Sequence, residues 1–172
     1  MRRHQPRPTL PTRRNKKNQK GRKMVAGGKA NTLLLQRIAE IYDWLDLQIS
    51  SHSDLAGRCD ACGRCCDFEG FDHRLFVTTP ELMYLAANVG SENIKPMLTS
   101  RCPYQTNDRC TIYEYRFAGC RIFCCKADKD FQSSLSGSAI KKFKLLCTEF
   151  QIPYRYTDLA TALSSIEPCR RV

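Results

Sequence analysis

The run Cys59-Asp60-Ala61-Cys62-Gly63-Arg64-Cys65-Cys66 places four thiols within eight residues. Seven more cysteines follow, five of them between positions 102 and 125, at 102, 110, 120, 124 and 125. So dense a series forms a disulfide framework in small secreted proteins, whereas in a reducing compartment it binds a metal ion or an iron–sulfur cluster. The fold and the function of the chain depend on which of these applies.

The length of 172 residues suits one domain plus a tail. The net charge of +11 belongs to the tail, because residues 1–30 hold eleven of the 28 Lys and Arg residues and no Asp or Glu. Residues 31–172 have 17 basic and 17 acidic residues and are therefore neutral. The charge gives no reason to expect that the folded part binds nucleic acid.

Residues 1–30 contain too few apolar side chains to collapse, so the sequence predicts a disordered basic tail. One interpretation is a solvated leader, with Met24 as an alternative start. The other is an arm that makes weak contact with RNA or another polyanion, for which Lys and Arg suffice. The tail has no aromatic residue that could stack on bases, which favours the first interpretation.

The basic start is followed by no apolar run of secretory-signal length, and no stretch is long and apolar enough for a membrane-spanning helix. Three prolines at positions 6, 8 and 11 and a low serine content argue against a mitochondrial transit peptide. We therefore expect a cytoplasmic protein with reduced thiols. The odd total of eleven cysteines also disfavours a disulfide framework.

Apolar residues recur at intervals of three and four between positions 34 and 49, which predicts an amphipathic helix over roughly 32–49. The residues of this stripe are Leu34, Ile38, Ile41, Leu45 and Ile49, with Tyr42 and Trp44 beside them. A loop over 50–58 then leads to the cysteine run.

A short strand is expected at 75–77, and Thr78-Thr79-Pro80-Glu81 has the capping pattern of a helix start. This helix is expected to run to Asn88 and to end at Gly90. Further helices are predicted at about 138–150 and 158–165, the latter with Thr157 as its cap.

The segment from Cys102 to Tyr113 resembles a β-hairpin. A loop centred on Thr106 would place Cys102 opposite Cys110, close enough to share a metal, whereas a turn at Asn107-Asp108 would separate them. The predicted fold is thus α+β and mainly helical. It is a small single domain over 31–172, organised around cysteine-rich loops and a short hairpin, with the disordered basic tail in front.

The spacing Cys-x-x-Cys aims two sulfurs at one point, and here two such turns overlap, with Gly63 allowing the tight backbone between them. Three thiols at this spacing are also a common way to hold an iron–sulfur cluster, with a fourth cysteine from elsewhere. The side chains of Cys65 and Cys66 diverge, so one of them is expected to serve a second site or the core.

Cys147 falls on the apolar side of a predicted helix and is interpreted as an ordinary buried thiol. Cys169, near the end of the chain, is interpreted in the same way. Cys125 is the weakest candidate among the remaining nine. The candidate ligands are Cys59, Cys62, Cys65, Cys66, Cys102, Cys110, Cys120 and Cys124.

Taken together, these motifs resemble the YkgJ-type cysteine-cluster family, whose domain is described as zinc- or iron-chelating. The resemblance covers roughly residues 55–125. It rests on Cys59-x-x-Cys62-Gly-x-Cys65-Cys66, Thr79-Pro80-Glu81, Cys102-Pro103-Tyr104, Cys110-Thr-Ile112-Tyr113-Glu114, Arg116 and Cys120-Arg121-Ile-Phe123. It implies a metal or iron–sulfur site built from the first seven candidate ligands, and Cys124 would be an eighth if there are two sites.

Members of this family commonly carry the label iron–sulfur oxidoreductase, and one relative, the flagellin lysine methylases, methylates protein lysines. The present chain is too short to include more than the shared domain. It also departs from the family where Phe117 follows Arg116, because the family usually has Pro there. Pro would fix φ near −65°, so the substitution leaves the position of Cys120 open.

Two functions follow from these expectations. The first is a cytosolic iron–sulfur protein with a [4Fe–4S] cluster. It would serve electron transfer or an oxidoreductase, together with a redox partner. Arg64 and Arg121 would then lie beside the cluster. The second is a zinc-binding structural or interaction module without catalysis.

A catalytic enzyme is the weaker interpretation, because no phosphate-binding loop is present and no catalytic residue can be nominated. His52 and His73 flank the cysteine run. Either could be a ligand or a proton carrier, or an ordinary surface histidine.

Overall fold

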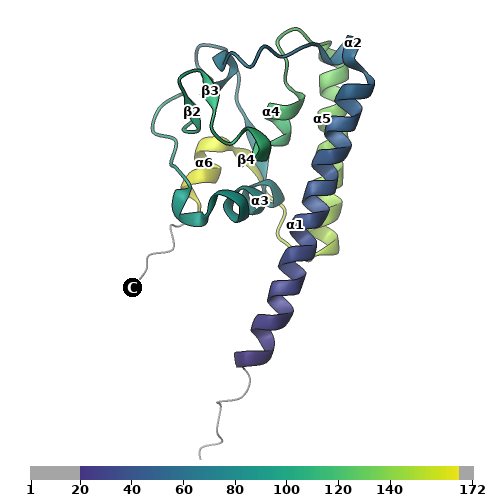
Figure 1. Ribbon diagram of the computed structural model, residues 1–172, viewed down its shortest axis with the longest axis vertical. Coiled ribbons are helices and arrows are strands. Elements are labelled where there is room, and N and C mark those ends of the chain that lie inside the picture. Colours follow the sequence, from purple (N-terminus) through teal and green to yellow (C-terminus); the bar gives the residue numbers. More distant parts are fainter. Residues whose placement is uncertain (1–19, 167–172) are drawn as a thin grey trace, which may run out of the picture. The chain divides into compact units, whose positions relative to one another are not determined.

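The computed structural model describes residues 20–166, with side chains from residue 31 onward, and its contacts divide the chain after Leu33 into two units (Figure 1). Residues 1–19 are outside the described residues. Most of the predicted disordered tail, and with it the polyanion contact of the second interpretation, falls in this range. Helix α1 (Lys20–Ser51) begins at Lys20 rather than near residue 32. Its first turns contain good helix formers such as Lys, Met and Ala but no apolar stripe, so periodicity alone could not indicate them.

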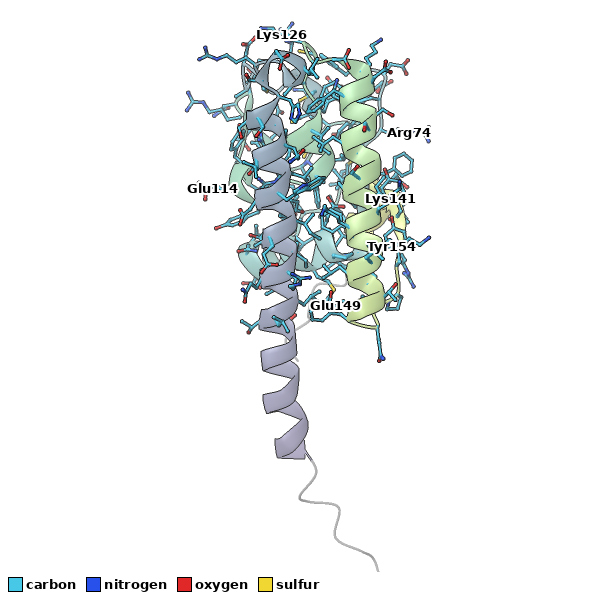
Figure 2. The ribbon with its side chains drawn as sticks, turned by 90° about the vertical axis from the view of Figure 1, so that its right-hand side faces the viewer. Arg74, Glu114, Lys126, Lys141, Glu149 and Tyr154 are labelled. Carbon is cyan, nitrogen blue, oxygen red and sulfur yellow. The ribbon has the colours of Figure 1, made fainter. Side chains whose placement is uncertain are left out.

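From Leu34 onward α1 packs against helix α5 (Lys129–Glu149), and the two helices lie side by side in both views (Figures 1 and 2). The predicted apolar stripe of α1 forms this core. Leu34, Ile38, Tyr42 and Leu45 are at most 3% exposed, and Phe143 of α5 meets the ring of Tyr42 edge-on with centroids 5.9 Å apart. The helical core is therefore packed with side chains that the sequence pattern predicted to be buried.

Helix α5 is confirmed but begins at Lys129, nine residues before the predicted start at 138. Asp128 caps it, since its carboxylate accepts a hydrogen bond from the N–H of Phe131 at 2.8 Å. The first turns carry polar side chains on most positions and hide the helical period. Cys147 is buried in this helix, as predicted.

Strand β1 (Phe76–Thr78) is antiparallel to strand β4 (Tyr156–Asp158), which the sequence did not predict. Helix α3 (Thr79–Val89) starts with the predicted capping box, and Gly90 after its last turn has φ +85°. Helix α6 (Leu159–Ser164) follows β4 directly. Its cap is Asp158 rather than Thr157, because the Asp158 carboxylate accepts from the N–H of Thr161 at 3.0 Å.

The hairpin consists of β2 (Gln105–Thr106) and β3 (Arg109–Cys110), joined by a tight turn at Asn107-Asp108. Both turn residues have positive φ, at 49° and 59°, as a type I′ turn requires. Cys110 is therefore paired with Gln105. Of the two predicted alternatives, the turn at Asn107-Asp108 is confirmed, and the loop centred on Thr106, which would place Cys102 opposite Cys110, is wrong. Cys102 lies outside the ladder.

The remaining elements are short: α2 (Ser53–Ala56), α4 (Ala118–Ile122) and the 3₁₀ turns η1 (Arg64–Cys66), η2 (Ser91–Asn93) and η3 (Tyr113–Tyr115). A second core gathers around Val77, Leu85, Phe117 and Leu159, all at most 2% exposed, with Cys102, Cys110 and Cys120 at its edge. The α+β, mainly helical fold matches the prediction. Among the described helices, none combines the length and apolar character needed to cross a bilayer.

Candidate metal centre

Nine cysteine side chains line one cavity of about 910 Å³. They come from four separate parts of the chain: the run 59–66, the segment before β2, strand β3, and α4 with the residues after it. The nine are Cys59, Cys62, Cys65, Cys66, Cys102, Cys110, Cys120, Cys124 and Cys125. The eight candidate ligands thus share one cavity, together with Cys125, the weakest candidate.

Cys66 and Cys102 are brought together by a short stretch of antiparallel pairing. Asp67 forms a β-bridge with Arg101, and the N–H of Cys102 donates to the carbonyl of Cys66 at 2.8 Å. The side chains of Asp67 and Arg101 form an ion pair across this bridge at 2.7 Å. These contacts fix two thiols that are 36 positions apart in the sequence against each other.

Gly63 holds the cysteine run against the hairpin turn. Its φ is +67°, and a Cβ atom at this position would lie 2.8 Å from the carbonyl oxygen of Asp108. No other residue fits so close an approach without displacing the backbone. The expected tight backbone at Gly63 is confirmed, and it brings the run close to Cys110 on β3.

Cys120 is positioned by α4, a helix that the sequence pattern did not predict. The buried carboxylate of Glu81 accepts hydrogen bonds from Thr78 in the capping box and a further one from the N–H of Ala118, at 2.8 Å. Phe117 is the residue before α4, and its φ of −63° is a value that Pro would also adopt. The backbone before Cys120 therefore has the φ that Pro would impose, although Phe stands at this position.

Backbone N–H groups face several of the sulfurs. In four places the N–H two residues after a cysteine donates to its sulfur: Ala61 to Cys59, Arg64 to Cys62, Tyr104 to Cys102 and Ile112 to Cys110. Hydrogen bonds of this kind stabilise a thiolate.

Five half-buried thiols interact with one another, and we call them the inner set: Cys65, Cys66, Cys102, Cys110 and Cys120. The Cys65 thiol donates to Cys66, which together with burial raises its pKa. Cys66 donates to Cys102, which raises the pKa of Cys66 to about 11 and lowers that of Cys102. Burial raises the pKa of Cys110 and Cys120. Most of the inner thiols therefore stay protonated until a cation displaces their protons.

The other four form the outer set: Cys59, Cys62, Cys124 and Cys125. Cys59, Cys62 and Cys125 are exposed, whereas Cys124 is buried. The Nε of Arg64 lies 3.4 Å from the sulfur of Cys62 and lowers its pKa. Lys126, at the end of the helical pair opposite Glu149 (Figure 2), forms an ion pair with Asp60 at 2.6 Å that links the two segments.

Two of the predicted accessory residues lie elsewhere. Arg121 is turned away from the cavity, with an ion pair to Asp46 at 2.7 Å and its guanidinium over the ring of Tyr42. His52 is exposed and bonds to the carbonyl of Gln48. His73 does line the cavity, but its Nε2 is within 2.9 Å of the carbonyl oxygen of Cys65 and its ring stacks on Phe123. Its contacts support the backbone at Cys65.

In the described part of the chain, no group of three or more His, Cys, Asp or Glu side chains is arranged to hold a metal ion. The ten described cysteines are free thiols, and Cys169 lies outside the described residues. The donor set nevertheless fits a thiolate-bound metal, because many sulfurs share one cavity and several already accept N–H groups.

No protein-family model, no curated protein and no solved structure matches the chain significantly.

Proposed function

We propose that this chain is an iron–sulfur protein whose cluster is held in the cavity by four of the five inner thiols. The observation that carries the proposal is the meeting of cysteines from four parts of the chain around one cavity of about 910 Å³. The cluster would supply electron transfer, or serve an oxidoreductase, with a protein redox partner. A reducing compartment such as the cytoplasm suits the free thiols.

The size of the cavity favours a cluster over a single zinc ion. Zinc holds four sulfurs at about 2.3 Å, so that the ligands close around the ion and leave little space between them. Here the thiols stand around an open volume with apolar walls that include Phe68, Phe71 and Phe123. A cluster of several iron and sulfide atoms fills more of such a space.

The inner set is favoured over Cys59, Cys62 and Cys125 because its sulfurs are partly shielded from water, whereas these three thiols are exposed. All five inner cysteines are half-buried, and Cys102, Cys110 and Cys120 pack at the edge of the second apolar core. Solvent exposure and hydrogen bonds to the sulfurs are among the factors that set a cluster's potential and its resistance to loss. Exposed thiols such as Cys59 would leave the cluster open to water.

Binding would draw the inner sulfurs together. Cys65, Cys66 and Cys110 are carried by a turn and a strand of two or three residues, which can shift by small amounts without breaking a long helix. Metal affinity at such a site includes free energy of folding. The resemblance of residues 55–125 to the YkgJ-type family agrees with this proposal.

The test is anaerobic purification followed by elemental analysis and an absorption spectrum of the whole chain. We expect bound iron and sulfide and a broad band near 400 nm. Colourless protein with one equivalent of zinc would replace this proposal with a zinc-binding structural module, and protein free of both metals would overturn a metal function altogether.

Three matched Cys→Ser variants locate the ligands. Cys102→Ser should lose most of the bound iron, whereas Cys59→Ser in the outer set should keep it. Cys147→Ser, in the helical core, controls for the loss of a thiol. Loss of iron in Cys59→Ser together with retention in Cys102→Ser would move the cluster to the outer set.

A further inference from the structure

The side chain of Arg116 is an unpaired cation at the cavity. Its Nε is buried and, among the described residues, has no hydrogen-bond partner. The guanidinium lies over the ring of Tyr113, 3.9 Å from its centroid, and forms no ion pair in the described part of the chain. Burying a guanidinium N–H without an acceptor is costly unless a ligand supplies one.

Arg116 shares the cavity with the inner thiols. It lines the same cavity as Cys65, Cys110 and Cys120, which come from three separate parts of the chain. In contrast, the Nε of Arg64 lies 3.4 Å from the sulfur of the outer thiol Cys62.

The backbone of Arg116 is fixed from behind. Its carbonyl accepts a hydrogen bond from the Nε of Arg121 at 3.1 Å, and Arg121 is itself held by the ion pair with Asp46. Phe117, the next residue, is 1% exposed and directly precedes α4. The guanidinium therefore projects from a rigid segment, with its orientation kept by Tyr113 rather than by an acidic partner.

We propose that Arg116 compensates the negative charge of the metal centre and donates its free Nε–H to a sulfur of that centre. The inference rests on the proposed iron–sulfur function and adds the residue that sets the potential of the cluster. Four thiolate ligands bring four negative charges into a half-buried site, and a fixed cation beside them stabilises the more negative, reduced state. Arg116 is thus a tuning residue rather than a catalytic one.

The test compares Arg116→Gln, Arg116→Lys and Arg64→Gln with the wild-type protein. Each is purified anaerobically, its iron is measured, and its midpoint potential is determined by spectroelectrochemical titration. Arg116→Gln should shift the reduction equilibrium at least tenfold toward the oxidised state, which is about 59 mV for one electron. Arg116→Lys should restore most of the potential, and Arg64→Gln, at an exposed position, should change it less because solvent screens its charge.

The outcomes separate this inference from the function on which it rests. Wild-type protein without iron overturns both. Iron in the wild type, with an unchanged potential in Arg116→Gln, overturns the role of Arg116 and leaves the iron–sulfur function standing. If Arg116→Gln fails to hold iron, recovery of iron and of the potential in Arg116→Lys supports a role for the positive charge at position 116. Failure of both variants to hold iron overturns that role in favour of a structural one.

Discussion

The helical region, formed by α1 from Leu34 onward and α5, differs from the cysteine region, residues 59–125, in what fills its interior. In the helical region apolar side chains close the space completely, and Ile38 and Leu45 are 0% exposed. In the cysteine region sulfurs surround a cavity of about 910 Å³. Each fully buried leucine contributes roughly 1.5–3 kcal/mol to stability, whereas an open cavity contributes nothing.

The comparison indicates that the two regions depend on different sources of stability. Long helices with a buried stripe are stabilised by packing alone. Most elements of the cysteine region are turns and strands of two or three residues, connected by hydrogen bonds between distant segments. An apolar core around Val77, Leu85 and Phe117 stabilises part of the cysteine region, and the proposed metal centre would stabilise the segments around the cavity.

Removal of the metal is the largest perturbation that this comparison predicts. An iron chelator should abolish hydrogen-exchange protection in η1, β2 and β3 while α1 and α5 keep theirs, because only the former depend on the centre. The loss should amount to several kcal/mol and lower the melting temperature by about 10 °C or more. Hydrogen exchange with mass spectrometry measures both regions in one sample.

Chelator-treated Cys102→Ser protein is the control for metal removal, and no further change is expected in it. An equal loss of protection in α1 and α5 would show that the two regions unfold as one unit. Undiminished protection in β2 and β3 would show that the cysteine region needs no metal.

The second prediction concerns the helical region. Leu45→Ala should lower the free energy of unfolding by about 2–5 kcal/mol, because Leu45 is fully buried and its loss leaves a cavity. The amount of iron per folded chain should stay the same. Urea denaturation followed by circular dichroism measures the stability.

Leu47→Ala is the matched control for Leu45→Ala, since Leu47 lies on the same helix and is 59% exposed. Its stability should change by no more than about 0.5 kcal/mol. Similar losses in both variants would contradict the assignment of the buried face of α1.

The helical region was predictable because its determinants are local. The intervals between Leu34, Ile38 and Leu45 indicate both the helix and its buried face without reference to any distant residue. Prediction failed where side chains gave no period, as in the polar first turns of α5. Strand β4 was missed because its partner β1 lies about 80 positions earlier in the sequence.

The composition of the cysteine region was predictable, but its geometry was not. The spacing of the cysteines, together with the family resemblance, selected eight of the nine that line the cavity, all except Cys125. The bridge between Asp67 and Arg101 that unites Cys66 and Cys102 has no local signature. For the same reason the sequence indicated Arg64 and Arg121 as the cations beside the centre, whereas the ion pair with Asp46 turns Arg121 away and Arg64 and Arg116 line the cavity.

Glu81 lies where the two regions meet, and its substitution is the smallest effect predicted. Its carboxylate accepts from Thr78 and from Ala118 at the start of α4, and it interacts electrostatically with Tyr42 of α1. Glu81→Gln should lower the free energy of unfolding by about 1 kcal/mol, as the loss of a helix cap does. The side-chain amide of the Glu81→Gln variant would place an N–H donor against the N–H and hydroxyl of Thr78. Both of these groups are donors in the wild type, so a hydrogen bond would be lost.

The effect of Glu81→Gln should depend on pH. Burial raises the pKa of Glu81 above its ordinary value of 4.5, so between that value and its folded pKa the folded state binds more protons than the unfolded state. The stability of the wild type should therefore fall, relative to Glu81→Gln, as the pH rises above about 4.5, and should level off above the folded pKa. Urea denaturation of both proteins between pH 4.5 and 8 measures the difference, in which the other carboxylates cancel. Parallel stability curves would mean that Glu81 is ionised as easily in the folded chain as in the unfolded one, and that the junction between the two regions is open to water.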